Sequence, residues 1–332
     1  MPSFSHDLET LGFSAYFAAQ FAELARPDLV PARIAADGQS VWRLAGCRAA
    51  LGELSGKLRH GLAHEERPAV GDWVAVADGE ARAIIHHILP RRTALARRAA
   101  SLDAVSQVIA ANVDLFGIVT SANQDLNPRR VERYLAAVWE SGASPMIVLN
   151  KTDLVDDVAP LRALLDEVAL AVPVVEASAA TGAGLTDLQA MLAPGKTVAF
   201  IGSSGVGKSS LVNRLLGREA QHVSGIREDD ARGRHTTTRR ELLPLPGGAV
   251  LIDTPGMREF GLTEDGGGVD AAFADISELA EQCRFNDCRH EGEPGCAVQA
   301  ALAAGTLAPE RWESYRKLQR EAAAYEARQD PA

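Results

Sequence analysis

The chain has 332 residues, of which 46% are hydrophobic and 23% charged, and its formal net charge is −10. This composition is typical of a globular protein of two or three domains, and no run of about 18 apolar residues predicts a membrane span. The start, Met1 to Asp7, has neither a basic nor a long apolar segment, so we expect a cytoplasmic protein without an export signal. Four cysteines are too few for a disulfide scaffold, and the acidic balance alone disfavours nucleic-acid binding.

Basic residues are concentrated in one part of the chain. Residues 31–100 contain 11 Lys and Arg against 7 Asp and Glu, although the whole chain has 34 basic and 44 acidic side chains. Four arginines stand close together at the end of this segment: Arg91, Arg92, Arg97 and Arg98. A local basic cluster of this kind is either a solvated linker or a surface that faces phosphate groups.

The first hundred residues predict two structural units. In segment 1–30, apolar residues such as Phe13, Phe17 and Phe21 recur partly at helical spacing and predict a short amphipathic extension that packs on the rest of the protein. Residues 31–98 alternate short β-type runs with Gly and Asp turns, which is typical of a small β-barrel. The expected strands are Val30–Ala35, Val41–Leu44, Trp73–Val76 and Ala83–Leu89.

The following segment, 99–265, predicts an α/β domain, because continuous apolar runs alternate with helical stretches as in a parallel sheet covered on both faces. The expected strands are Val113–Thr120, Pro145–Leu149, Val172–Ala177, Thr197–Ile201 and Ala249–Ile252, and the expected helices are 128–141, 159–170, 185–193 and 207–216. Glu241–Leu245 predicts an antiparallel edge strand. After a glycine-rich joint, residues 266–332 predict a small helical domain.

Residues Gly202 to Ser209 fit the phosphate-loop pattern G-x-x-x-x-G-K-[ST]. A strand is expected directly before the motif and a helix directly after it, and this context argues against a Gly/Ser turn that matches by chance. The backbone N–H groups of such a loop bind phosphate oxygens, Lys208 reaches the β- and γ-phosphates, and Ser209 ligates Mg²⁺. The expected phosphate-binding residues are Gly202, Ser203, Ser204, Gly205, Val206, Gly207, Lys208, Ser209 and Ser210.

A second motif, Asn150-Lys151-Thr152-Asp153, predicts a guanine-binding site after the preceding strand. The Asp153 carboxylate can accept hydrogen bonds from both guanine N1–H and the N2 amine, a donor pair that adenine lacks. Asn150 is expected either to bind the other edge of the base or to tie its loop to the phosphate loop. The aliphatic stem of Lys151 is expected to lie over the base.

Ser178 and Ala179 follow the next expected strand and can offer backbone N–H groups to guanine O6. A lone N-K-x-D pattern also describes an ordinary polar loop, so it is weak evidence on its own. Its combination with Ser-Ala and a phosphate loop in one sheet predicts that the nucleotide is GTP rather than ATP.

Asp253 and Gly256 fit the D-x-x-G switch motif, and Asp253 is expected to hold Mg²⁺ through water. Between the phosphate loop and this motif lie Thr236 to Thr238, among which Thr237 is the expected switch threonine for Mg²⁺ and the γ-phosphate. In an ordinary Ras-like GTPase the N-K-x-D and Ser-Ala motifs come last, but here they come first. The order predicts a circularly permuted GTPase, which still assembles one site because each motif follows its own strand.

Three of the four cysteines and one histidine lie within fourteen residues: Cys283, Cys288, His290 and Cys296. Three thiolates and one imidazole suit a closed, tetrahedral structural Zn²⁺ site. Because the spacing is not the common pair of C-x₂-C motifs, buried cysteines and a redox pair are the alternatives. The concentration of cysteine in one segment favours one zinc ion per chain. Cys47 is expected to be an ordinary half-buried residue.

With these motifs together, the chain resembles the ribosome small-subunit-dependent GTPases of the RsgA (YjeQ) family, from about residue 31 to 325. The resemblance rests on the permuted order, the phosphate loop, the Cys/His cluster and three further stretches, Gln107–Asp114, Asn127–Leu135 and Gly233–Thr238. It implies an N-terminal OB-fold, a permuted GTPase domain and a C-terminal zinc domain. It also implies late maturation of the small ribosomal subunit, with GTP hydrolysis that the subunit stimulates.

The expected catalytic residues are Lys208 and His235. In Ras-like enzymes a glutamine after the D-x-x-G glycine orients the attacking water, but that position is Met257 here. His235 stands directly before the threonine run, and an imidazole, partly neutral near pH 7, can orient water. The family's G-x-H-T-T-T stretch is matched at this position. The alternative is that His235 only packs or contacts RNA.

The expected partners are GTP or GDP and the small ribosomal subunit with its rRNA, with no membrane and no second copy of the chain. RNA contact is expected on the 31–100 barrel and its arginines. A tail helix is the second candidate, and packing is the alternative role of its residues Arg311, Trp312, Arg316 and Lys317.

Three function classes are compatible with these motifs. The first is a GTPase whose cycle times its binding to rRNA, and the second is a GTP-dependent scaffold or checkpoint whose hydrolysis is incidental. The third, a zinc-handling GTPase, is disfavoured because a closed Cys₃His site leaves no open coordination position for metal transfer.

Overall fold

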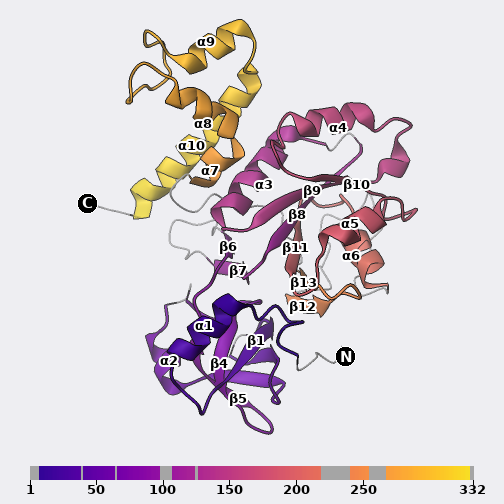
Figure 1. The fold of residues 1–332 in the computed structure, drawn as a ribbon, viewed down its shortest axis with the longest axis vertical. Helices are drawn as coiled ribbons and strands as arrows, with labels where there is room; N and C mark the ends of the chain where they lie inside the picture. The colour runs from indigo at the N-terminus through magenta and orange to yellow at the C-terminus, as the bar shows by residue number, and fades with distance from the viewer. Residues whose placement is uncertain are drawn as a thin grey trace, which may run out of the picture.

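The computed structural model describes residues 7–38, 40–63, 66–97, 107–123, 126–217, 240–253 and 267–329. An N-terminal β-barrel, a central sheet flanked by helices and a C-terminal group of helices follow one another along the longest axis of the molecule (Figure 1). The expected fold class, a small barrel with a permuted α/β fold and a helical tail, is confirmed. Among the described residues, no helix is both long and apolar enough to cross a membrane.

The barrel consists of five strands and one short helix. They are β1 (Val30–Ala36), β2 (Trp42–Ala45), β3 (Leu51–Leu54), α2 (Gly56–Gly61), β4 (Trp73–Ala77) and β5 (Ala83–Ile88). The strand order β1-β2-β3-β5-β4 closes through pairing of β1 with β4, which is an OB-like arrangement. Strand β3 was not predicted, because its sequence Leu-Gly-Glu-Leu is short and contains a glycine. A Cβ at Gly52 would lie 2.7 Å from the Leu44 side chain, so core packing favours glycine there.

Helix α1 (Ala15–Glu23) packs an aromatic cluster on the barrel. Phe17 is buried, and its ring centroid lies 5.9 Å from that of Trp73 in β4. Phe13, just before the helix, meets Trp73 edge-on at 4.8 Å. The predicted amphipathic extension is therefore confirmed, since its aromatic side chains bury themselves against the barrel.

The central sheet consists of five parallel strands and one antiparallel strand, Glu241–Pro244. This strand was expected at the edge of the sheet, but it also pairs with β1 of the barrel. The strands are β8 (Leu115–Ser121), β9 (Ser144–Asn150), β10 (Val174–Glu176), β11 (Thr197–Ile201), β12 (Glu241–Pro244) and β13 (Val250–Asp253). Their order is β10-β9-β8-β11-β13-β12, with β12 antiparallel to β13. The strand that leads into the phosphate loop, β11, has the expected bounds and lies in the interior of the sheet.

Helices cover both faces of this sheet (Figure 1). They are α3 (Pro128–Glu140), the 3₁₀ turn η1 (Thr152–Leu154), α4 (Ala159–Asp166), α5 (Leu185–Met191) and α6 (Lys208–Leu216). Along β11 the side chains alternate: Ala199 and Ile201 belong to the core that α3 and α4 complete, whereas Val198 and Phe200 belong to the core under α5 and α6. This alternation explains why the strand reads as a continuous apolar run.

Two features join the barrel to the sheet. Strand β1 pairs with β12 at Ala36 and Glu241, so one hydrogen-bonded sheet runs through both units. In addition, β6 (Ala94–Arg97) pairs with β7 (Gln107–Ala111). The boundary expected between residues 98 and 99 therefore falls between two paired strands. Neither β6 nor β7 was predicted as a strand.

Arg33 of β1 is a buried cation at this junction, with 1% of its surface exposed. Its guanidinium donates to the carbonyl oxygens of Leu11, Gly71 and Asn112 and to the Thr197 hydroxyl, and it lies over the Trp73 ring. Burial lowers the pKa of Arg33 to about 10, which still leaves the side chain charged at neutral pH. The hydrogen bonds compensate for the lost hydration and fix the barrel against the strand that enters the phosphate loop.

The tail consists of α7 (Gly267–Ala272), α8 (Ala274–Glu281), α9 (Ala297–Ala304) and α10 (Pro309–Gln329). It lies beside α3, away from the barrel (Figure 1). The carboxylate of Glu132 in α3 is fully buried and accepts hydrogen bonds from Arg311 and Ser314 of α10. Arg133 and Glu321 form a second ion pair between the same two helices. The tail is therefore attached to α3 both through these charged contacts and through a shared apolar core that includes Phe273 and Leu135.

Candidate functional site

The phosphate-loop motif forms a loop between β11 and α6, at the carboxyl end of the parallel sheet. Gly202, Gly205 and Gly207 all have positive φ angles, which only glycine adopts without strain. A Cβ at Gly202 would lie 2.2 Å from the Val119 carbonyl oxygen of β8, and one at Gly207 would lie 2.2 Å from Asn150 Nδ2. The glycines are thus required both by backbone conformation and by close approach of neighbouring loops.

Lys208 begins helix α6, and its side chain folds back over the loop. Its Nζ donates to the carbonyl oxygens of Gly202 at 2.7 Å and Ser203 at 2.6 Å. Arg130, in the first turn of α3, donates to the Ser203 hydroxyl. Sequence analysis included Arg130 in the stretch Asn127–Leu135 but assigned it no role at the phosphate loop, because it lies 73 residues before Ser203.

Asn150 connects three loops of the site. Its Nδ2 donates to the Val206 carbonyl oxygen at 2.8 Å, and its Oδ1 accepts from the Ala179 N–H at 3.1 Å. Both contacts are buried, since Asn150 has 1% of its surface exposed. Of the two roles expected for Asn150, the structure therefore has the one that ties its loop to the phosphate loop.

The Asp153 carboxylate lies beside Ser178, whose hydroxyl donates to Asp153 Oδ1. Thr152 donates from its backbone N–H and its hydroxyl to the Ala177 carbonyl oxygen. Lys151 adopts a left-handed φ of 63°, which turns the chain between strand β9 and the 3₁₀ turn. The N-K-x-D and Ser-Ala motifs are thus held against one another at neighbouring strand ends.

Arg214 of α6 is a supporting residue that sequence analysis missed. Its Nε donates to the carbonyl oxygen of Ala179 at 2.8 Å, and its Nη2 donates to that of Ala180 at 2.7 Å. The helix that begins in the phosphate loop therefore also fixes the loop expected to meet guanine. The only sequence signal for this role of Arg214 is its place in the last turn of α6, and that signal is weak.

The switch motifs are described in part. Asp253 ends β13, a parallel neighbour of β11 with Ile252 paired to Ala199, so Asp253 lies beside the strand that enters the phosphate loop. Ser209 and Ser210 follow Lys208 in the first turn of α6. The remaining expected switch residues lie outside the described residues: His235, Thr236, Thr237, Thr238, Gly256 and Met257.

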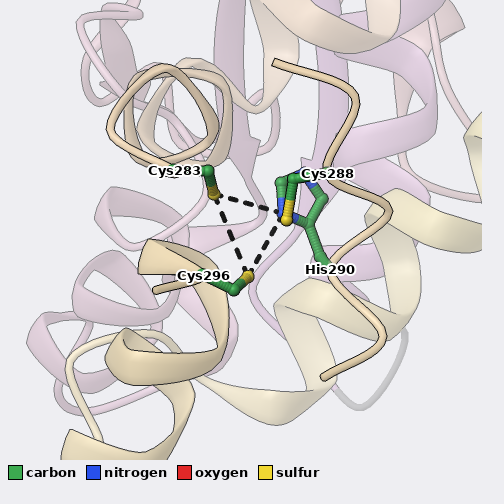
Figure 2. Close-up of side chains that lie close together, drawn as sticks. All are labelled: Cys283, Cys288, His290 and Cys296. Atoms are coloured by element: carbon green, nitrogen blue, oxygen red, sulfur yellow. Dashed lines mark hydrogen bonds between the residues drawn. The ribbon is translucent and has the colours of Figure 1, made fainter. Parts of the chain in front are cut away.

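A second site lies in the tail, where Cys283, Cys288, His290 and Cys296 converge (Figure 2). Their ligand atoms all lie within 4.8 Å of one another. Cys283 Sγ is 3.9 Å from Cys296 Sγ, and His290 Nδ1 is 3.5 and 3.4 Å from these two sulfurs. A tetrahedral zinc ion with ordinary bond lengths has edges of about 3.8 Å between sulfurs and about 3.5 Å between sulfur and nitrogen. The distances among Cys283, His290 and Cys296 therefore fit tetrahedral Zn²⁺, and Cys288 lies within reach as the fourth ligand.

The surroundings of the cluster favour the thiolates of Cys283 and Cys296. The backbone N–H groups of Ala297 and Gln299 point at the sulfurs of Cys283 and Cys296, and Cys296 caps the N-terminus of α9. Both kinds of contact stabilise negative charge on sulfur. Burial, together with the neighbouring thiols, raises the pKa of Cys288 to about 11, so its proton must leave when a metal binds.

Cys47 is not part of this cluster and is buried rather than half-buried. Its Sγ donates to the Ala49 carbonyl oxygen, and burial raises the pKa of its thiol to about 12. A thiol of this pKa has little thiolate at neutral pH and is chemically inert.

Two of the arginines expected to face RNA form ion pairs with carboxylates of the protein instead. Arg91 forms a bidentate ion pair with the fully buried Asp72, and Arg92 pairs with Asp114. Arg97 ends strand β6, and Arg98 lies outside the described residues. The expectation of four phosphate-facing arginines therefore requires correction for Arg91, because its guanidinium neutralises a buried carboxylate.

In the tail helix, the second RNA candidate, Arg311 and Trp312 are buried, with 6% and 8% of their surface exposed. Trp312 lies edge-on to His290, and the Arg316 guanidinium lies over the Trp312 ring. Lys317 is exposed. Packing, the alternative considered for this helix, accounts for Arg311 and Trp312.

Comparison with known proteins decides the family. The sequence model of the family described as RsgA GTPase matches residues 88–263, which is more than half of the chain. The chain belongs to the RsgA GTPase family. Two relatives are named small ribosomal subunit biogenesis GTPase RsgA. The relative from Opitutus terrae is 47% identical to this chain, over 98% of this chain and 92% of the relative. The relative from Streptomyces coelicolor is 52% identical, over 76% of this chain and 69% of the relative.

Solved structures support the fold of this RsgA-family chain. The crystal structure of YjeQ from Thermotoga maritima covers 89% of this chain and 99% of its own with a TM-score of 0.67 at 27% identity. YloQ, described as a circularly permuted GTPase, covers 92% of this chain and 97% of its own with a TM-score of 0.64 at 23% identity. The permuted motif order predicted from the sequence is confirmed by this chain's own sheet, in which N-K-x-D follows β9 and the phosphate loop follows the later strand β11.

Proposed function

We propose that this RsgA-family GTPase hydrolyses GTP in the biogenesis of the small ribosomal subunit. The observation that carries the proposal is the convergence of the phosphate loop, N-K-x-D and Ser-Ala motifs through Asn150, in a chain 47% identical to a relative named for that function. The finer partners are rRNA of the subunit, bound by a monomer in the cytoplasm. For the RNA contact we exclude Arg91, because its guanidinium already forms an ion pair with the buried Asp72.

In this proposal each motif residue has one task at the nucleotide. Asp153 accepts from the guanine N1–H and N2 amine, with Ser178 and Ala179 at O6, while Asn150 braces the loops and Lys151 covers the ring. The phosphates lie on the loop and on Lys208. The complete nucleotide-binding set is Asn150, Lys151, Thr152, Asp153, Ser178, Ala179, Gly202, Ser203, Ser204, Gly205, Val206, Gly207, Lys208, Ser209, Ser210, Thr237, Asp253 and Gly256.

Magnesium accompanies the phosphates. Ser209 and Thr237 are the direct ligands we propose, and Asp253 binds the ion through water, in line with its place beside β11. The ion neutralises charge on the β- and γ-phosphates when bound. His235 orients the attacking water, because Met257 has no group that can do so.

Replacement of His235 by alanine tests the proposal. GTP binding and small-subunit binding should stay unchanged, but the subunit-stimulated rate of GTP hydrolysis should fall roughly a hundredfold, since positioned proton transfer contributes at least this much. Single-turnover hydrolysis with small subunits, large subunits or neither measures the effect. Equal rates in all three mixtures would instead favour a GTP-dependent scaffold, and a fully retained stimulated rate in the variant would remove His235 from this role.

Asp153→Asn should reverse the choice of base. The amide replaces one acceptor by a donor, so guanine loses a charge-assisted pair and xanthine gains a matching one. We expect GTP affinity to fall about a hundredfold and XTP affinity to rise. Titration of each nucleotide by calorimetry measures this, with Asp156→Asn, an exposed acid three residues on, as the matched control. Unchanged GTP affinity in Asp153→Asn would refute the assignment.

The tail holds one structural zinc ion per chain in this proposal, on Cys283, Cys288, His290 and Cys296. Four protein ligands fill a tetrahedral ion, so the site has no open position for catalysis or metal transfer. We further propose that the chain divides into an extension, 1–30, a barrel, 31–98, a GTPase domain, 99–265, and a zinc domain, 266–332. The β6–β7 pairing across residue 98 implies that the barrel and the GTPase domain move together.

A further inference from the structure

Two cationic side chains from different elements meet at Ser203, the second residue of the phosphate loop. Lys208 donates to its carbonyl oxygen at 2.6 Å, and Arg130 of α3 donates to its hydroxyl. Because the lysine of this motif binds the β- and γ-phosphates, its contacts with Gly202 and Ser203 mark the start of the loop as the γ-phosphate end of the site. Arg130 therefore reaches the loop at that end.

The position of Arg130 is fixed by its helix. The Asn127 side chain caps α3 by accepting from the Arg130 backbone N–H at 3.2 Å. Two residues later, the buried Glu132 carboxylate binds Arg311 and Ser314 of α10. Because the helix is attached at both points, it cannot slide or rotate freely. The Arg130 guanidinium is therefore held in a fixed position beside the loop.

The contact has a chemical consequence for Ser203. A hydroxyl that accepts a hydrogen bond from a guanidinium keeps its own proton for a different acceptor. Beside the γ-phosphate, the available acceptors are anionic oxygens, and positive charge fixed in advance near them favours the nucleotide that carries the extra phosphate. GDP lacks the γ-phosphate, so this fixed positive charge stabilises bound GDP less than bound GTP.

We propose that Arg130 is a positioning residue for the γ-phosphate: acting through the Ser203 hydroxyl, it holds the start of the phosphate loop in the form that prefers GTP to GDP. The inference rests on the proposed nucleotide site. It adds a residue of α3, the helix that also carries the tail, to the groups that distinguish the two nucleotides.

Calorimetric titration of GTP and GDP tests the inference on the full-length protein. Arg130→Ala should weaken GTP binding about tenfold and GDP binding less than twofold, because a hydrogen bond to a charged group contributes at least this much. Ser203→Ala should give a similar ratio, and the double variant should lose no more than either single one. Arg59→Ala, an exposed arginine of α2 in the barrel that pairs with Glu53, is the matched control and should change neither affinity.

Added guanidinium at millimolar concentration should restore part of the GTP preference of Arg130→Ala and leave the control unaffected, a result that a merely structural role does not give. An equal loss of GTP and GDP affinity, additive losses in the double variant, or an unchanged ratio would overturn the inference. Failure of the unmodified protein to bind either nucleotide would instead overturn the proposed function itself. The two failures are therefore distinguishable.

Discussion

Removal of zinc is expected to unfold the segment from Cys283 to Cys296 and to lower the folding free energy of the tail by on the order of 10 kcal/mol, as for structural zinc in small domains. Between Cys283 and the start of α9 the chain forms only turns and bends. One residue of this segment, Phe285, is 42% exposed, so the loop contributes little core of its own. Metal ligation is then the main interaction that holds the segment together.

The nucleotide site should survive this loss. The core under α5 and α6, which includes Leu211 and Leu215 behind the phosphate loop, contains no residue of the described tail. Chelation should therefore abolish the cooperative unfolding of the tail in a thermal melt while GTP binding persists.

Elemental analysis and melting of cysteine variants check the assignment. Cys288→Ser should lose the zinc ion, whereas Cys47→Ser, at a buried thiol far along the chain from the cluster, should keep one ion per chain. Full zinc content in Cys288→Ser, or an unchanged melt after chelation, would contradict a structural zinc site.

The elements around the nucleotide were predictable because local patterns decide them. Strand β11 has the bounds predicted from its apolar run, and α3 and α6 begin or end within one residue of the prediction. In each case the motif residue stands at the end of a buried strand, where parallel strands bring loops together. Local sequence therefore determined which residues meet there.

The barrel was only partly predictable, because its remaining strands depend on pairing partners far along the chain. Strand β3 has four residues, one of them Gly52, and it is stabilised by parallel pairing with β5 rather than by its own propensity. Outside the barrel, β6 and β7 likewise depend on pairing with each other. A short strand of this kind carries no distinct pattern of its own.

The ion-pair partners of the charged side chains were the least predictable feature of the structure. Arg91 and Arg92 look like a phosphate-binding pair in the sequence, but Asp72 and Asp114, nineteen and twenty-two residues away, neutralise them in the structure. Arg311 similarly pairs with Glu132 across 179 residues. Sequence spacing cannot distinguish a buried ion pair from an exposed basic patch, because the partner is set by tertiary packing.

Arg311→Met is expected to destabilise attachment of the tail by about 3–5 kcal/mol, the usual cost of breaking a buried ion pair from one side. Arg311 contacts the fully buried Glu132 at 3.0 Å and binds Asp275 through two nitrogens. Although burial alone would lower the pKa of Arg311, the hydrogen bonds and charges of Asp275 and Glu132 raise it. Loss of the guanidinium leaves the Glu132 carboxylate buried with less compensation.

Urea unfolding, followed by tryptophan fluorescence, measures this effect, and the second variant Glu132→Gln separates charge from packing. Because a neutral amide no longer needs a cation, Glu132→Gln with Arg311→Met should recover part of the loss. Arg316→Met, on the same helix but 43% exposed and paired with the exposed Glu291, should change stability by less than about 1 kcal/mol. If Arg311 instead served RNA, its substitution would weaken small-subunit binding and leave unfolding unchanged, which is the opposite of what its burial predicts.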